Sequence, residues 1–255
     1  MSDSPSNPDS AIALSLAKTE YNRQRAFPQP KDNLYIHLSD LRLFLDKYCD
    51  HRFERLIDFG CGGSPYRSLF NANNYVRADF LDTGELDYTI NDKGKIEMPD
   101  ESCDGVLSTQ VLEHVFSPTA YLSEAFRLLR PGGKLILTTH GIWEDHGCPY
   151  DFRRWTHDGL TRELEAVGFK VKRIVKLTTG PRAILSLFAG ILYQLKDSRF
   201  SLSGLAFRLL RHSSFAVPEK RHMWMDHYFA GNRIVSADES GHTLYLALGI
   251  EGVKP

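Results

Sequence analysis

An aspartate and two glycines carry the clearest chemical information in this chain: Asp58, Gly60 and Gly62, spaced as D-x-G-x-G. They follow the β-favouring pair Leu56-Ile57, so the pattern predicts a strand that ends in a tight glycine turn. Glycine has no Cβ, which lets the backbone turn sharply and lets a ligand approach closely. After the turn we expect a helix over residues 64–70, whose free N–H groups would face a polar or anionic ligand.

Two nearby features narrow the type of ligand. A dinucleotide site reads G-x-G-x-x-G, and Pro65 stands at the third glycine. Asp58 would repel a pyrophosphate, whereas it suits a ligand that carries an ammonium group. A second acid, Asp79, lies 79 − 58 = 21 residues further on, at about the spacing where a ribose hydroxyl pair is held. Its competitor Asp82 lies past the expected strand end and is more simply a solvated loop acid.

The motif resembles motif I of the class I S-adenosylmethionine-dependent methyltransferases, of the type 11-like group. Residues 96–115 resemble the segment of that family that runs through a fourth strand to an E-H pair. The family's L-x-P-G-G signature is seen as Leu129 with Pro131-Gly132-Gly133. With the acid at Asp79, four motifs stand in the family's order within residues 39–176, a little over half of the chain.

The resemblance implies that S-adenosylmethionine is the cofactor. Asp58 and the turn amides would hold its amino-acid end, and Asp79 would hold its ribose. Residues 21–23 would either close over the carboxylate or pack against the core. The cofactor contacts implied in full are Asp58, Gly60, Cys61, Gly62, Asp79, Phe80, Met98, Thr109, Gln110 and His114.

The acceptor side is expected in residues 139–156, which resemble a stretch of methyltransferases from glycan and secondary-metabolite pathways. His140 and His146 are candidate bases, because a neutral imidazole takes a hydroxyl proton near pH 7. Asp151 is a third catalytic candidate. The side chains expected to contact the acceptor are Trp143, Tyr150, Arg153 and Arg154. The alternative is a hydrogen-bonded connector, with Asp151 paired to Arg153 or Arg154 and Thr156 capping the next helix.

A metal site is not expected. One related group of O-methyltransferases binds a metal through E-x-x-E-H, and Glu113-His114 matches its end. The first position is Gln110, which leaves two ligands, too few for a metal ion.

The expected reaction is in-line transfer of a methyl group to a small-molecule, glycan or lipid-linked acceptor, with O-methylation favoured. The protein mainly aligns the reactants and excludes water. A non-catalytic S-adenosylmethionine-binding scaffold and an NAD-dependent oxidoreductase stay as alternatives, the latter disfavoured by Asp58 and Pro65. Residues 108–111 lack the N/D-P-P-Y/F motif of the enzymes that methylate DNA bases.

Composition limits partners and location. The chain has 255 residues and a formal net charge of −1, which gives no electrostatic footprint for nucleic acid. Its four cysteines show no paired spacing, as expected of reduced thiols in a cytoplasmic protein. The N-terminus lacks the pattern of a signal peptide. These features suggest a biosynthetic enzyme of the cytoplasm, with the oligomeric state left open.

These residues require an α/β framework. We expect a Rossmann-like sheet of seven strands, mostly parallel, with a helical cap insertion. The resemblance implies that the last strand, over residues 242–250, runs antiparallel between the fifth and sixth. The expected organisation is an N-terminal tail and lid helix over 1–38, a cofactor-binding core over 39–178, a cap over 179–241, and the last strand and tail over 242–255.

The insertion leaves two readings open. Residues 183–195 are apolar around most of a helix, yet too few to span a bilayer. They would form a buried cap helix. Alternatively, residues 183–212 would make peripheral contact with the inner face of a membrane, because basic residues flank the second apolar stretch, 202–210.

Overall fold

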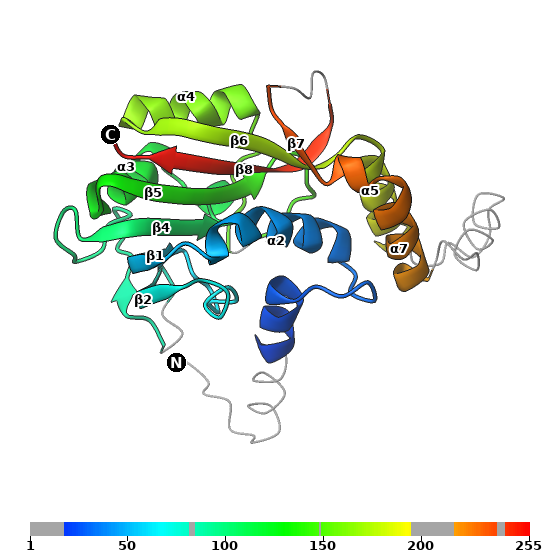
Figure 1. The fold of residues 1–255 in the computed structure, drawn as a ribbon, viewed down its shortest axis with the longest axis horizontal. Coiled ribbons are helices and arrows are strands. Elements are labelled where there is room, and N and C mark those ends of the chain that lie inside the picture. The colour runs from blue at the N-terminus through cyan, green and yellow to red at the C-terminus, as the bar shows by residue number, and fades with distance from the viewer. Residues whose placement is uncertain (1–17, 82–84, 148, 195–216, 239–242) are drawn as a thin grey trace.

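One twisted sheet organises the molecule, for which the computed structural model describes residues 18–81, 85–147, 149–194, 217–238 and 243–255 (Figure 1). The described part contains eight strands in the order β3-β2-β1-β4-β5-β8-β6-β7. In chain order the strands are β1 (Phe53–Phe59), β2 (Ala72–Asp79), β3 (Tyr88–Thr89), β4 (Cys103–Thr109), β5 (Leu129–His140), β6 (Lys170–Thr179), β7 (Ile234–Ser236) and β8 (Tyr245–Val253).

The sheet confirms the expected class and the placement of the last strand. Strands β3, β2, β1, β4 and β5 pair in parallel. Strand β8 lies between β5 and β6 and runs antiparallel to both. The sequence predicted seven strands, and the structure adds β7, which comes from the insertion and pairs antiparallel with β6. The insertion therefore extends the sheet as well as carrying helices.

Helices cover both faces of the sheet. Helix α2 (Tyr35–Cys49) packs through Leu41, Phe44 and Leu45 into a core on one face. Helices α3 (Pro118–Leu128) and α4 (His157–Val167) pack into a second core on the other face. Helices α5 (Gly180–Gln194) and α7 (Pro218–Tyr228) lie beyond the end of the sheet at which β6 ends (Figure 1).

Local signals explain where several elements begin and end. Thr156 caps α4, accepting a hydrogen bond from the Gly159 amide, as the connector reading expected. Gly168 ends the same helix at φ +114°, a left-handed conformation that favours glycine. Ser117 precedes α3, and Pro118 lies in its first turn, where proline is tolerated. The described elements also include an N-terminal helix over residues 18–26 and two short 3-10 turns, η1 (Leu112–His114) and η3 (Ala230–Asn232).

The helix predicted over residues 64–70 is wrong, because this segment forms consecutive turns. Ser64 has a φ of +51°, which breaks a right-handed helix at its first residue. Tyr66 and Phe70 are buried in the core beside β1, so the segment folds flat onto the sheet. Residues 64–70 therefore present no helix N-terminus to the glycine turn.

A buried charge cluster fastens the insertion to α2. Arg182 is fully buried and its Nε lies 2.8 Å from Asp40 Oδ2. The same guanidinium reaches Asp226 of α7 at 2.8 Å, and Arg233 contacts Asp40 at 2.8 Å. The second apolar stretch, over 202–210, and its flanking basic residues lie outside the described residues.

Candidate functional site

The glycine turn after β1 has the backbone that its sequence predicts. Gly60 and Gly62 have φ values of +80° and +51°. A Cβ on Gly60 would lie 2.5 Å from Val111 Cγ1, so both its conformation and its surroundings require glycine. A Cβ on Gly62 would meet nothing within 4 Å. The turn is therefore closed toward β4 at Gly60 and open at Gly62, where a ligand can approach the backbone.

Asp58, at the end of β1, is buried beneath this turn. Its Oδ2 accepts a hydrogen bond of 2.7 Å from the Tyr75 hydroxyl. Burial, together with the nearby Asp79 carboxylate, raises the pKa of Asp58 to about 7, although the Tyr75 hydroxyl opposes this shift. A cationic group brought to this carboxylate would be attracted, and it would favour loss of the proton.

Asp79, at the end of β2, lies against the same turn. Its two carboxylate oxygens accept hydrogen bonds from the amides of Gly62, at 2.7 Å, and Leu81, at 3.2 Å. Phe80, beside it, is exposed. The strand ends thus bring together Asp58, the glycine turn and Asp79, as predicted. Cys61 is buried in the turn, and burial raises the pKa of its thiol to about 12.

Side chains of α3 hold the backbone of the segment that carries Met98. The carboxylate of buried Glu124 accepts the Ile96 amide at 3.0 Å. Arg127 donates to the Met98 carbonyl at 2.7 Å and pairs with Glu124 at 2.6 Å. Met98 is almost fully buried, and its backbone carbonyl is held by Arg127 of α3.

The N-terminal helix over residues 18–26 contacts the glycine turn through Asn22. Its amide nitrogen donates to the Gly63 carbonyl at 2.9 Å, and a Cβ on Gly63 would lie 2.7 Å from Asn22 Oδ1. Arg23 instead pairs with Glu20 and Asp32 within its own segment. Residues 21–23 were expected to close over the cofactor carboxylate or to pack against the core. Of these residues, Asn22 contacts the glycine turn.

Gln110 combines strain with unmet hydrogen-bonding capacity at the end of β4, beside Thr109. Its φ is +55°, which is uncommon for a residue with a side chain. Among the described residues, neither atom of its buried side-chain amide has a hydrogen-bond partner. Strained residues and unsatisfied polar groups gather at functional sites. Gln110 therefore combines a strained backbone with unused hydrogen-bonding capacity at the end of β4.

A cluster of aromatic rings lies next to Gln110. The imidazole of His140, at the end of β5, stacks on Trp143 at 4.8 Å between ring centroids. His37, near the start of α2, stacks on His140 at 5.3 Å and contacts Trp143 at 4.6 Å. His146 meets His140 edge-on at 5.1 Å. The start of α2, the end of β4 and the segment that runs from the end of β5 into the next loop therefore meet at this end of the sheet.

Two histidines of this cluster have lowered pKa values. Burial lowers the pKa of His37 to about 3 and holds the pKa of His140 well below its usual range. Both imidazoles are neutral at pH 7 and are weak proton acceptors. His146, whose side chain is 35% exposed, lies within 3.4 Å of Asp151 Oδ2 through its Nδ1. It is therefore the candidate best placed to exchange a proton.

Glu113, in η1, faces this cluster from within the core. Its side chain is completely buried and its Oε2 accepts a hydrogen bond of 2.8 Å from Thr139. Its Oε1 lies 3.4 Å from His140 Nε2 and 4.0 Å from His114 Nε2. Burial raises the pKa of Glu113 to about 7.

The loop from β5 to α4 is held by Arg154. Its guanidinium pairs with Asp151 and also donates to the carbonyls of Trp143 and Glu144, at 3.2 and 2.7 Å. The hydrogen bond from Arg154 keeps the pKa of Asp151 well below its usual range. The connector reading of Asp151 and Arg154 matches these contacts.

Arg153 and Tyr150, which were also predicted to contact the acceptor, make hydrogen bonds to η1 and to the residue after it. Arg153 donates to the Val115 carbonyl at 2.8 Å, which ties this loop to the end of η1. Tyr150 is largely exposed, with its backbone oxygen 2.6 Å from His114 Nδ1. The loop and η1 are therefore anchored to each other by side-chain hydrogen bonds to backbone carbonyls.

Sequence reasoning missed His37. It comes from α2, far from every motif, and it stacks directly on two predicted site residues. The available signal was a histidine among the apolar residues Ile36, Leu38 and Leu41 on the buried face of that helix. A polar ring in such a position requires a reason, and here the neighbouring rings supply it.

The comparisons with known proteins agree with this geometry. A model described as a methyltransferase domain matches residues 22–174, more than half of the chain. A probable S-adenosylmethionine-dependent methyltransferase from Mycolicibacterium smegmatis is 33% identical over 104 residues, covering 38% of this chain and 39% of that protein. A ubiquinone biosynthesis O-methyltransferase from Dinoroseobacter shibae is 31% identical over 151 residues. The match covers 46% of this chain and 60% of the length of that protein.

The chain thus matches between 39 and 60% of the length of these relatives. Among solved structures, the cyclase SpnF superposes with a TM-score of 0.55 at 17% identity, covering 96% of this chain and 94% of that one. At this identity the likeness concerns the fold alone. A fold shared with a cyclase does not decide the reaction, which must be argued from the site.

Proposed function

The chain belongs to the methyltransferase family, and from this premise we propose that it methylates a hydroxyl oxygen of a small-molecule, glycan or lipid-linked acceptor. The observation that carries the proposal is the pairing of His146 with Asp151 in the loop after β5. The glycine turn follows β1, which runs parallel to β5, so both lie at the edge of the sheet where these strands end. An imidazole held by a carboxylate is suited to accept a proton from a hydroxyl group.

S-adenosylmethionine is the cofactor, and it supplies a methyl group on a sulfonium that carries its own leaving group. The described residues fit it: an open backbone at Gly62, a buried acid at Asp58 and an unpartnered amide at Gln110. We propose that Asp58 attracts the ammonium group and that Asp79 holds the ribose hydroxyls. Asn22 covers the turn, which helps to exclude water.

Among the three catalytic candidates, the contacts favour His146 as the proton acceptor. His140 is buried and its lowered pKa makes it a weak base, so its role is to stack against Trp143 and shape the site. Asp151 is committed to Arg154 and orients His146 through Nδ1, which leaves Nε2 to face an acceptor. The protein otherwise acts by alignment, which suits an in-line displacement.

Labelled S-adenosylmethionine and matched acceptors that differ only in a hydroxyl or an amine group provide the test. We expect S-adenosylhomocysteine to form, and the label to appear on the hydroxyl acceptor. Transfer to the amine partner alone would overturn O-methylation. Cofactor binding without product on any acceptor would instead support the non-catalytic scaffold.

The insertion is proposed as the acceptor-facing cap, with the helix over residues 18–26 as the lid. Ile184, Phe188 and Ile191 follow one another along an exposed side of α5. This row supports the reading of a surface that contacts lipid or a lipid-linked acceptor over the buried-helix reading. Within the described residues, no helix is both long enough and apolar enough to cross a bilayer. We therefore propose peripheral contact of a cytoplasmic enzyme.

A further inference from the structure

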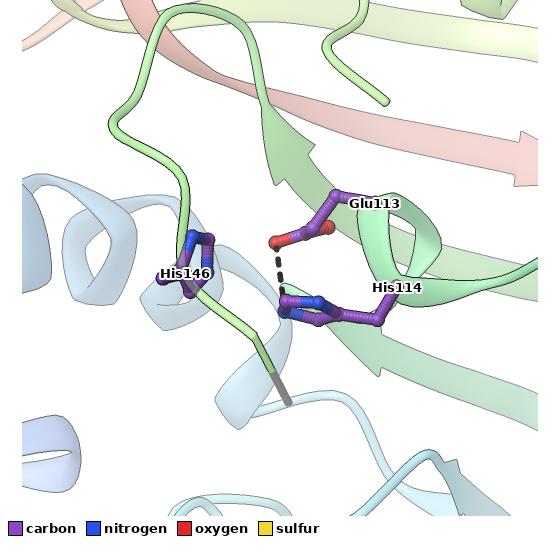
Figure 2. Close-up of side chains that lie close together, drawn as sticks. All are labelled: Glu113, His114 and His146. Atoms are coloured by element: carbon purple, nitrogen blue, oxygen red, sulfur yellow. Dashed lines mark ion pairs between the residues drawn. The ribbon is translucent and has the colours of Figure 1, made fainter. Parts of the chain in front are cut away.

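Glu113, His114 and His146 converge beside the ends of β4 and β5 (Figure 2). One carboxylate oxygen of Glu113 and one ring nitrogen of each histidine lie within 4.8 Å of one another. Glu113 and His114 come from η1, and His146 comes from the loop after β5. We propose that these three side chains bind one divalent transition-metal ion, for which Zn²⁺ is the appropriate probe.

The outward contacts of the two histidines fix the ring nitrogen that faces inward. His114 Nδ1 lies 2.6 Å from the Tyr150 carbonyl oxygen, to which it donates as N–H. His146 Nδ1 lies 3.2 Å from the Glu144 carbonyl and 3.4 Å from Asp151 Oδ2. With the proton on Nδ1, each ring has its lone pair on Nε2. Histidines that ligate metals are oriented in this way by carbonyls and carboxylates.

One carboxylate oxygen of Glu113 accepts no hydrogen bond among the described residues, and the nearby ring nitrogen of His140, Nε2, lies 3.4 Å from it. Glu113 Oε2 is held by the Thr139 hydroxyl at 2.8 Å, which orients the carboxylate. Its Oε1 is buried and has no hydrogen-bond partner among the described residues. A buried carboxylate oxygen without a partner costs free energy. A cation coordinated by Oε1 would remove that cost, and His114 Nε2 lies 4.0 Å from this oxygen.

The donor set selects the kind of ion. Two imidazoles and one carboxylate suit zinc and its neighbours, whereas Mg²⁺ and Ca²⁺ prefer oxygen ligands. Three protein ligands leave at least one coordination position open, as in catalytic zinc sites. The ligand atoms must approach one another on binding, because zinc bonds are only about 2.1 Å long. His114 and His146, which are partly exposed, can supply this movement.

The sequence pattern could not show this site. It offered E-x-x-E-H with Gln110 in the first position, which predicted no metal. The third donor comes instead from His146, 146 − 114 = 32 residues beyond the pair. Its approach depends on how Arg154 and Asp151 fold the loop back over η1.

A bound ion would also change the activation of the acceptor, a consequence that rests on the proposed function. An acceptor hydroxyl in the open position would have its pKa lowered by the ion, and it would lose its proton more readily. His146 cannot bind the ion and accept a proton through the same nitrogen. The metal-loaded protein would therefore activate the acceptor by coordination.

Calorimetry of the full chain, treated first with a chelator, tests the binding itself. We expect wild type to bind one Zn²⁺ per chain and not to bind Mg²⁺ comparably. His114→Ala and His146→Ala should each weaken Zn²⁺ binding by about tenfold or more. His227→Ala, which removes an exposed histidine of α7, is the matched control and should bind as wild type does. Equal affinity in all four proteins, or no Zn²⁺ binding by wild type, would overturn the site.

Two further measurements separate possible failures. The absorption spectrum of Co²⁺-loaded wild type reports nitrogen and oxygen coordination directly, without any variant. A spectrum identical to aqueous Co²⁺ would overturn the site even if a variant failed to fold. Binding of S-adenosylmethionine is measured in the same samples. Zn²⁺ binding without cofactor binding would count against the proposed function alone, and the reverse would count against the metal site alone.

Discussion

Single residues set how the cofactor end responds to pH. With its pKa raised to about 7 by burial, the carboxyl of Asp58 is protonated below that pH and ionised above it. A ligand ammonium group binds the ionised form, so binding below pH 7 requires a proton to be released. We expect the affinity for S-adenosylmethionine to fall by up to about tenfold per pH unit below 7, and to be constant above it. Calorimetry across about pH 5.5 to 8.5 measures this dependence.

Asp58→Asn is the control for this titration. Asparagine keeps an oxygen for the Tyr75 hydroxyl and has no proton to lose in this range. Its affinity should be weaker at pH 8 and should not vary with pH. A wild-type affinity that is unchanged between pH 6 and 8 would mean that Asp58 does not contact the ammonium group.

His146 is expected to matter for turnover and not for cofactor binding. His146→Ala should lower the rate of methyl transfer by about 10² or more, the range typical of a lost general base. Its affinity for S-adenosylmethionine should stay within about twofold, as expected of a side chain outside the cofactor end. The release of S-adenosylhomocysteine measures the rate. A variant that turns over like wild type would move the proton acceptor elsewhere.

Gly60 and Gly62 provide a matched pair for the backbone of the turn. Both have positive φ, so alanine at either position should cost about 1 kcal/mol in the free energy of unfolding. Gly60→Ala should cost about 2 kcal/mol more, because its Cβ would overlap Val111. Urea unfolding of both variants measures the difference. Val111→Ala should recover most of the extra cost, and no recovery would contradict the overlap.

At the level of secondary-structure elements, the Asp40–Arg182 pair decides how α5 is held on α2. Removing Arg182 takes the fully buried cation away from Asp40 and leaves the partly exposed Arg233 to compensate that buried charge. Arg182→Met should therefore lower the free energy of unfolding by about 3 to 5 kcal/mol. Arg233→Met, whose side chain is partly exposed and contacts the same Asp40, should cost about 1 kcal/mol. Equal costs, measured by urea unfolding, would show that burial of Arg182 is not what matters.

The elements differ in how far the sequence predicted them. Strand β1, which was predicted before the glycine turn, and the last strand, which was predicted over residues 242–250 and forms over Tyr245–Val253, were located within a few residues. The segment over 64–70 was wrong because a positive φ at Ser64 and burial of Tyr66 outweigh local preference. Strand β7 was missed because three residues within a long insertion carry no periodic signal.

The same limit applies to the site. Asp58, the glycines and Asp79 come together because each follows a parallel strand, and parallel strand ends share one edge of the sheet. His37 and the grouping of Glu113 with His146 depend on tertiary contacts between distant segments. The spacing of these residues along the chain does not predict those contacts. The cofactor end was therefore predictable, and the composition of the acceptor end was not.

At the scale of the whole molecule, the exposed row on α5 predicts attachment to lipid surfaces. Ile184, Phe188 and Ile191 should insert their side chains at a membrane interface. The full chain should sediment with vesicles that contain anionic lipid. The triple variant Ile184→Ser, Phe188→Ser and Ile191→Ser should remain in the supernatant while it still binds S-adenosylmethionine. Equal sedimentation of the two proteins would remove α5 from the contact surface.

The central position of β8 bears on how the polypeptide is made. Residues 245–253 follow every other strand of the described residues in sequence, yet they lie between β5 and β6. During synthesis both neighbours emerge from the ribosome long before the strand that separates them. Their backbone edges stay unpaired for that time, and open edges invite association with other chains. Loss of residues 245–253 would therefore split the sheet in its middle, and aggregation would follow.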